Sequence, residues 1–215
     1  MRLRNIAAAV LTAALAVGGD GVWGPARAQQ SPPAAAPVRL VVAPDGNEAR
    51  YRVREQLAGV DFPNDAVGKT AAVTGALVLD DRGAIVMAES EFVIDLSALT
   101  SDQARRDNFL RRNTLRTAEH PRAVFVPTGA QGLAFPLPQA GEAKFQLTGN
   151  LTLRGVTRPV TWDVTARFES GAVAGVAQTK FTFADFEITK PRLARVLSVD
   201  DDIRLEYEFR LVPKS

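Results

Sequence analysis

Cysteine is absent from this 215-residue chain, and histidine occurs only once. The missing thiols exclude disulfide scaffolds, thiolate metal sites, cysteine nucleophiles and a lipid-modified N-terminal cysteine. A single histidine excludes the usual zinc site built from several histidines. Spaced motifs such as G-x-S-x-G, H-E-x-x-H and the P-loop are also missing. We therefore expect no catalytic site and no metal site.

Long hydrophobic runs are equally scarce, and the one near the N-terminus is short. Arg2 and Arg4 precede an apolar run over residues 6–17, and small residues then lead to Ala26-Arg27-Ala28. A basic start, a short apolar run and an A-x-A site are typical of a secretory signal peptide, and the run is too short to span a bilayer comfortably. We expect residues 1–28 to be a signal peptide, and the mature protein to be periplasmic or secreted.

An excess of either charge sign is lacking in the expected mature chain. Removing residues 1–28 lowers the basic residues from 26 to 23 and the acidic residues from 24 to 23. The slight basic excess of the whole chain is therefore no argument for a nucleic-acid partner. Residues 29–37 (QQSPPAAAP) predict a Pro/Ala-rich extended linker, and residues 38–215 predict one folded domain.

Alternating apolar and polar residues dominate the folded part. Every second residue from Ile203 to Leu211 is apolar, and charged residues stand between them. A period of two residues predicts a half-buried β-strand. Eight such segments with short connections favour an all-β, antiparallel barrel whose interior holds side chains or one small ligand. The predicted strands are residues 48–56, 69–79, 84–95, 122–128, 144–153, 160–168, 180–183 and 203–211.

Residues 101–112 interrupt this pattern, lack β-branched side chains and predict one short helix between strands. The first residue, a serine, can cap the helix. The pairs Asp102–Arg106 and Asp107–Arg111 have the favourable spacing of four residues. We also expect a structural ion pair between Arg106 and Asp107.

Three stretches resemble the YceI family, which is also called the polyisoprenoid-binding or lipid-binding YceI-like family. The most specific stretch is GNLTLRGVTRPV at residues 149–160, which is similar to the family's G-x-L-T-[IL]-x-G-V-T-[KR]-P-V. The others lie within residues 95–125 (DLSALT, then Arg106-Asp107, then HPRAVF) and at residues 181–188 (FTFADFEI).

This resemblance, over about residues 48–212, implies an eight-stranded, lipocalin-like barrel that is usually periplasmic. It also implies a long apolar cavity for a polyisoprenoid lipid or a quinone, and no catalysis. The chain departs from the family at Phe183, where the family often has arginine. The polar contacts to a ligand head group are therefore expected to differ.

Inward-facing side chains of the predicted barrel are the candidate ligand-binding residues. Glu55 shares the apolar face of its strand, so its carboxylate either binds a ligand oxygen or lies at a strand end in solvent. The segment Ala58–Thr70 that follows could cover the cavity as a lid. The candidate ligand-binding residues are Tyr51, Val53, Glu55, Phe92, Phe145, Leu147, Trp162, Phe168, Phe181, Phe183, Tyr207 and Phe209.

Other functions remain open alongside a carrier of apolar lipids. The aromatic residues could fill the core of an interaction module without a ligand, and a small outer-membrane barrel would show the same alternation with inverted faces. The arginines between residues 105 and 116 could touch an anionic membrane surface transiently, although we favour a solvated helix face. The sequence does not indicate an oligomeric state.

Overall fold

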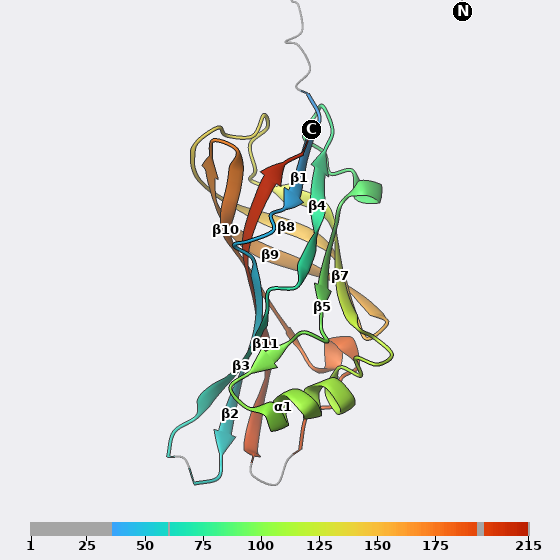
Figure 1. Ribbon diagram of the computed structural model, residues 1–215, viewed down its shortest axis with the longest axis vertical. Coiled ribbons are helices and arrows are strands. Elements are labelled where there is room, and N and C mark those ends of the chain that lie inside the picture. The colour runs from blue at the N-terminus through green and yellow to red at the C-terminus, as the bar shows by residue number, and fades with distance from the viewer. Residues whose placement is uncertain (1–35, 60, 193–195, 215) are drawn as a thin grey trace, which may run out of the picture. The chain divides into compact units, whose positions relative to one another are not determined.

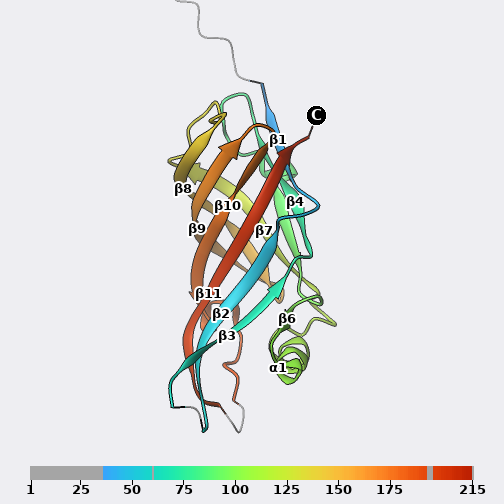
Figure 2. The ribbon, with the colours of Figure 1, turned by 60° about the vertical axis from the view of Figure 1, so that its left-hand side comes forward.

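The computed structural model describes residues 36–59, 61–192 and 196–214, and the structural statements below concern these residues. They form one antiparallel sheet of eleven strands that closes into a barrel (Figure 1 and Figure 2). The predicted signal peptide and most of the linker lie outside the described residues, so those boundaries stay predictions.

The closed ring of the barrel contains the strands in the order in which they pair, and β11 pairs back onto β1. These strands are β1 (Val38–Val42), β4 (Val73–Leu79), β5 (Glu91–Asp95), β7 (Arg122–Gln131), β8 (Gly141–Leu153), β9 (Val156–Glu169), β10 (Ala172–Thr182) and β11 (Val196–Pro213). Three further strands extend the sheet from β11 at the lower end of Figure 1, namely β2 (Glu48–Leu57), β3 (Asn64–Thr70) and β6 (Thr100–Ser101).

The eleven strands are eight strands of a barrel, three of which are interrupted. Both β1 and β2 pair with β11, β4 pairs with β1, and β3 pairs with β2. In the same way β5 pairs with β4, while β6 pairs with β3. The pairs β1/β2, β3/β4 and β5/β6 are thus upper and lower halves of three strands. The predicted eight-stranded antiparallel barrel with one short helix is confirmed.

Local hydrogen bonds explain why two predicted strands are not continuous. The predicted strand 69–79 breaks after Thr70, whose hydroxyl accepts a hydrogen bond from the backbone N–H of Ala72 at 3.1 Å. Such a bond competes with the sheet ladder. The predicted strand 84–95 contains the 3-10 turn η1 (Met87–Glu89) before β5 begins. The polarity of Asp200–Asp202 suggests a turn before the last strand, but the structure has no such turn. These residues lie inside β11, where its register with β2 is irregular.

The predicted helix is displaced and continues further than expected. Helix α1 (Ala104–Phe109) runs into the π-helical turn η2 (Leu110–Thr114), and a second 3-10 turn, η3 (Ala184–Phe186), follows β10. Ser101 does not cap α1, because it lies in β6 and its hydroxyl donates to Asp107 at 2.6 Å. Arg106 pairs with Glu55 and Asp102 and not with Asp107, so the predicted Arg106–Asp107 ion pair is wrong.

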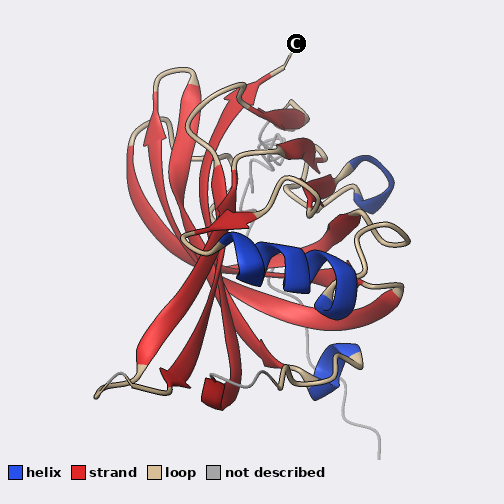
Figure 3. Ribbon diagram, turned by 60° about the horizontal axis from the view of Figure 1, so that its bottom comes forward, coloured by secondary structure: helices blue, strands red, loops and turns tan. Residues whose placement is uncertain are grey.

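The wall of the barrel is interrupted at its lower end, between β6 and β7. These two strands do not pair in the described sheet, and the chain between them forms α1 and η2. Figure 3, seen from the lower end, shows both helical segments lying across the barrel. A helix therefore replaces the missing strand contact, and its side chains contribute to the interior.

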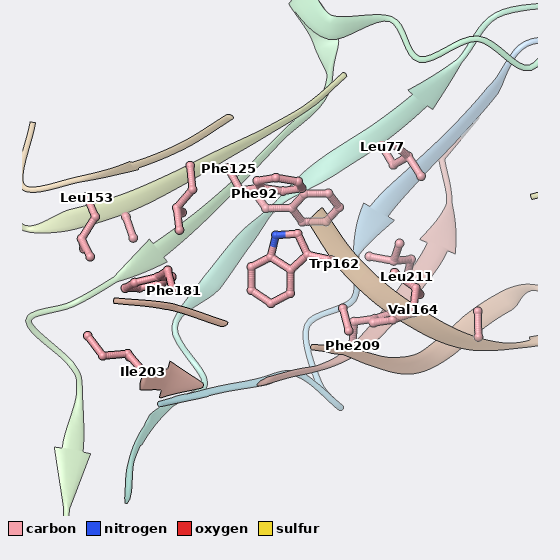
Figure 4. Close-up of a cluster of buried hydrophobic side chains, with 14 of the residues drawn as sticks. Leu77, Phe92, Phe125, Leu153, Trp162, Val164, Phe181, Ile203, Phe209 and Leu211 are labelled. Carbon is pink, nitrogen blue, oxygen red and sulfur yellow. The ribbon is translucent and has the colours of Figure 1, made fainter. Parts of the chain in front are cut away.

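Apolar side chains of the strands point into the barrel, as the period of two residues predicts. The close-up in Figure 4 shows Trp162 beside Phe125 and Phe92, and the ring centroids of Phe125 and Trp162 lie 5.8 Å apart in an edge-on arrangement. Gly149 makes this packing possible, because a β-carbon there would lie 2.5 Å from a ring carbon of Phe125. The glycine of the sequence motif thus has a steric reason.

Candidate functional site

A cavity of about 800 Å³ occupies the barrel interior. Its wall contains side chains from both halves of the interrupted strands and from α1 and η2. Every candidate ligand-binding residue named from the sequence lines this cavity; these are Tyr51, Val53, Glu55, Phe92, Phe145, Leu147, Trp162, Phe168, Phe181, Phe183, Tyr207 and Phe209. The structure brings the candidates together around one space, and ligand binding by them stays a prediction.

Several cavity-lining residues are not among the candidates predicted from the sequence. Phe109 and Leu110 at the junction of α1 and η2, and Leu133 and Leu137 in the connection between β7 and β8, line the same cavity. The first two are apolar residues in an otherwise polar helical segment, which was the available signal. The connection carries no periodic pattern, so its contribution required the tertiary structure.

The carboxylate of Glu55 is buried and ion-paired. Only 8% of the residue is exposed, and its Oε1 accepts a hydrogen bond from the Arg106 guanidinium at 2.8 Å. The expectation that Glu55 lies in solvent is therefore wrong. A carboxylate of β2 is instead compensated by a cation of α1, as a buried charge requires.

Arg106 is shared between two carboxylates. It also forms the predicted pair with Asp102, one helical turn earlier. Burial works to lower the pKa of the Arg106 guanidinium, but Asp102 and Glu55 outweigh it and raise that pKa. Conversely, the hydrogen bond from Arg106 lowers the pKa of Asp102. Arg106 thus stays charged and pairs with two carboxylates at the helix end of the cavity.

The chain's tyrosines both line the cavity but differ in their hydrogen bonding. The Tyr207 hydroxyl donates to Asn47 Oδ1 at 2.8 Å. The Tyr51 hydroxyl is buried and has no hydrogen-bond partner among the described residues. Burial raises the pKa of both phenols. The Thr114 hydroxyl and the indole nitrogen of Trp162 are likewise buried without a partner.

The remaining arginines of the helical segment have outward or structural contacts. Arg111 donates to the backbone carbonyl of Leu99 at 3.1 Å and not to Asp107, so the predicted Asp107–Arg111 pair is wrong. Arg116 pairs with Glu119. Arg105 reaches the cavity wall but is exposed.

The predicted lid is shorter than Ala58–Thr70. Asn64–Thr70 form β3, which pairs with β2 over its length, so these residues are part of the barrel wall. Only residues 58–63 remain as a connection between the two strands, with residue 60 outside the described part. The backbone of β3 is held by its sheet hydrogen bonds, which makes a lid of the predicted extent wrong.

The described ranges contain no cluster of three or more histidine, aspartate or glutamate side chains able to hold a metal ion. They also contain no helix that is long and apolar enough to cross a membrane.

Two solved structures resemble this fold. One is a polyisoprenoid-binding domain from Saccharophagus degradans implicated in plant cell wall breakdown, with a TM-score of 0.64 and 12% identity, covering 82% of this chain and 99% of that chain. The other is BcnA from Burkholderia cenocepacia, with a TM-score of 0.55 and 14% identity, covering 76% of this chain and 95% of that chain. At these identities the likeness shows a shared fold.

Sequence comparison identifies relatives and a family. A UPF0312 protein of Vibrio campbellii is 30% identical over 148 residues, which are 65% of this chain and 72% of the relative. One of Azotobacter vinelandii is 36% identical over 103 residues, so the match spans 44% of this chain and 49% of that relative. The pattern of the YceI-like domain matches residues 41–211. The chain therefore belongs to the YceI-like domain family, as the motifs in its sequence indicated.

Proposed function

We propose that this protein is an exported lipid-binding protein that sequesters or carries a polyisoprenoid-like apolar ligand inside its barrel. The observation that carries the proposal is the cavity of about 800 Å³ lined mainly by aliphatic and aromatic side chains. Pockets for small molecules typically measure about 300–1,000 Å³. Apolar lipid surface costs about 25 cal/mol per Å² in water, so transfer into this cavity is favourable.

The family relationship supports the same ligand class. The similar domain of Saccharophagus degradans binds polyisoprenoids, and a polyprenyl chain or the tail of a quinone has the length and apolarity that a barrel interior accommodates. Binding and release need no bond to be made or broken. We therefore propose transport or storage, and no catalysis, as the role of the cavity.

The cavity also separates this proposal from its two alternatives. An interaction module with a filled core would leave no space of this size inside the barrel. An outer-membrane barrel places apolar side chains outward and polar ones inward. Here Phe168, Phe181 and Phe209 are buried inside, whereas the residues between them, such as Arg167 and Lys180, are exposed.

Export is proposed from residues 1–28, which lie outside the described residues. The basic start, apolar run and Ala26-Arg27-Ala28 site are the reasons for it. A periplasmic or extracellular location is compatible with the absence of cysteine and with an apolar cargo that must cross an aqueous compartment.

Contact with a membrane surface during ligand exchange is the remaining part of the proposal. Phe62, in the connection after β2, and Leu197, in β11, are 78% and 66% exposed. They belong to neighbouring segments at the lower end, because Leu57 pairs with Val196, and both of these paired residues line the cavity. Exposed apolar side chains next to the end of an apolar cavity suit transient contact with a bilayer.

Native mass spectrometry of the freshly purified protein tests the lipid-binding proposal. We expect a bound species with the mass of a long-chain lipid. Ala177→Trp should abolish it by filling the cavity, because Ala177 is buried and lines it, whereas Gln178→Trp places the same side chain at the exposed neighbouring position. A folded wild-type protein that carries no lipid and takes up no polyprenol from vesicles would contradict the proposal.

A further inference from the structure

We propose that the Tyr51 hydroxyl anchors the ligand's head group, and that this head group is a neutral hydroxyl or carbonyl and not a phosphate. The inference rests on the proposed lipid-binding function and specifies which end of the ligand is recognised. It follows from an unpartnered polar atom in the cavity wall and from the charges around that atom.

The hydrogen bonding of the Tyr51 hydroxyl is incomplete. The Tyr51 hydroxyl has lost contact with solvent and has no partner among the described residues. A buried polar group without a partner costs about 1–3 kcal/mol, so such groups commonly mark a missing ligand contact. Tyr207, on the neighbouring strand β11, makes the contrast, because Asn47 satisfies its hydroxyl. The two tyrosines line one cavity, and of their two hydroxyl groups only that of Tyr51 has an unused donor.

The second step concerns how Tyr51 is held. Its ring lies over Gly68 of β3, the residue paired with it in the sheet, and a β-carbon on Gly68 would lie 2.2 Å from Tyr51 Cε1. The absence of a side chain at position 68 thus gives the ring its place. An anchoring donor needs such a defined position.

The third step excludes an anionic head group. The charged groups that act on the pKa of the Tyr51 hydroxyl are Arg106, Asp107, Glu55 and Asp102. Arg106 is the only cation among them, and it is already shared by Glu55 and Asp102. A phosphate near Tyr51 would therefore lie among three carboxylates, and it would have to share Arg106 with two of them, Glu55 and Asp102. A neutral oxygen that accepts the phenolic hydrogen bond has no such cost.

The other cations in the cavity wall do not change this balance. Arg50 is paired with Glu48, Glu206 and Glu208, and Arg105 is exposed on α1. The described part of the cavity wall thus offers no buried, unpaired cation for a phosphate.

Trp162 is a weaker candidate for the same role. Its indole nitrogen has no conventional partner, but Figure 4 shows it on the side that faces Phe92 and Phe125. An N–H group directed at an aromatic ring is partly satisfied. Trp162 also lies within an aromatic cluster, which suits the apolar chain of the ligand.

The test compares three lipids and three proteins. Wild type, Tyr51→Phe and the matched control Tyr207→Phe are equilibrated with phosphatidylcholine vesicles that contain a polyprenol, the corresponding polyprenyl phosphate or the corresponding hydrocarbon. The lipid captured by the protein is then measured. Comparing each variant with wild type for the same lipid cancels that lipid's own preference for the vesicle.

We expect Tyr51→Phe to reduce polyprenol capture about three- to tenfold, as the loss of one neutral hydrogen bond predicts, and to leave hydrocarbon capture unchanged. Because the Tyr207 hydroxyl is already bonded to Asn47, Tyr207→Phe should change the capture of polyprenol and of hydrocarbon by the same factor. Tyr51→Phe should reduce the capture of polyprenyl phosphate less than the capture of polyprenol. Equal effects of Tyr51→Phe on alcohol and hydrocarbon, or an effect on the phosphate as large as that on the alcohol, would overturn the anchor while leaving lipid binding intact. Capture of none of the lipids would instead overturn the proposed function.

A spectroscopic measurement keeps the test independent of variant stability. The chain contains two tyrosines, so the resonance that Tyr51→Phe removes identifies Tyr51 in the spectrum of the wild type. With tyrosine labelled by ¹³C at the ring carbon that carries the hydroxyl, the Tyr51 resonance of the wild type should shift when polyprenol binds and stay in place with the hydrocarbon. An unchanged resonance with bound polyprenol would overturn the anchor.

Discussion

The carboxylate of Glu55 accepts a hydrogen bond of 2.8 Å from the guanidinium of Arg106, a residue 51 positions later in the sequence. This contact joins β2 to α1, the helix that lies beside the gap between β6 and β7. In the described sheet, the segment between β5 and β7 pairs with a strand only through the two residues of β6, which pair with β3. The ion pair therefore fastens the helical segment to the wall of the cavity.

Removing the Glu55 charge should destabilise the protein, although the sequence suggested only a ligand contact or a strand end in solvent for this residue. Glu55→Gln leaves Arg106 buried with Asp102 alone, and we expect a loss of about 1–3 kcal/mol in the free energy of unfolding. Chemical denaturation measures it. The double variant Glu55→Gln/Arg106→Gln should recover part of the loss, and full stability of Glu55→Gln would refute a structural role for the pair.

Phe183→Arg should destabilise the protein and create a preference for phosphate. Phe183 is 5% exposed and lines the cavity, so an arginine there carries an unpaired charge that costs several kcal/mol. Polyprenyl phosphate should therefore raise the melting temperature of Phe183→Arg more than that of wild type. Phe183→Leu controls for the lost ring. Equal thermal shifts in both proteins would mean that Phe183 is remote from any head group.

Acid should destabilise the barrel through the carboxylates around Arg50. The hydrogen bond from Arg50 lowers the pKa of Glu206 from its usual value of 4.5. Because the folded-state pKa is depressed, the stabilisation is present above about pH 4.5 and disappears as the pH falls through the folded-state pKa. Melting temperatures of Glu206→Gln should fall less steeply between pH 6 and pH 3 than those of wild type or of the exposed control Glu142→Gln. Parallel curves would argue against this contribution.

Exposed apolar residues at the lower end should speed lipid exchange. Phe62→Ser and Leu197→Ser should slow the transfer of a fluorescent polyprenol analogue from vesicles to the protein, since less apolar surface can enter the bilayer. The amount bound at equilibrium should not change. Met87→Ser removes an exposed apolar side chain from η1 as a control. If all three variants exchange lipid at the same rate, the lower end is not the contact surface.

Export should leave a mature protein that begins at Gln29. The Ala26-Arg27-Ala28 site motivates the prediction. N-terminal sequencing or intact-mass measurement of protein from the periplasm or the medium checks it. Replacement of Ala26 and Ala28 by bulky residues should block processing, and a mature protein that retains Met1 would rule out a cleaved signal.

Alternation in the sequence identified most of the barrel strands and their inner faces, but it did not identify β1, β3 or the part of β10 before residue 180. The apolar positions between Ile203 and Leu211, and the aromatic residues of β9 and β10, line the cavity as their spacing predicted. A strand's faces are set by a local period of two residues, so no distant contact is needed to read them. The motif at residues 149–160 also indicated the family from the sequence alone, because its glycines and turn residues meet local backbone and steric requirements.

Contacts between distant segments were decided only by the tertiary structure. Ser101 was expected to cap a helix, but it lies in β6, which pairs with β3, and its hydroxyl donates to Asp107. The Glu55–Arg106 pair depends on the path of α1 across the lower end, which no local pattern encodes. Whether the barrel is filled or hollow depends on the summed volumes of side chains from every strand.

The two tyrosines show most clearly the difference between what the sequence determined and what the tertiary structure decided. In the sequence, Tyr51 and Tyr207 are equivalent, since each is an aromatic residue at an inward position of an alternating strand. In the folded chain, Asn47 lies beside the Tyr207 hydroxyl, and nothing in the described part of the protein meets the hydroxyl of Tyr51. The sequence determined where both rings point, because strand periodicity is local. The tertiary structure decided which hydroxyl has a partner within the described part of the protein, because a hydrogen-bond partner is supplied by another segment of the chain.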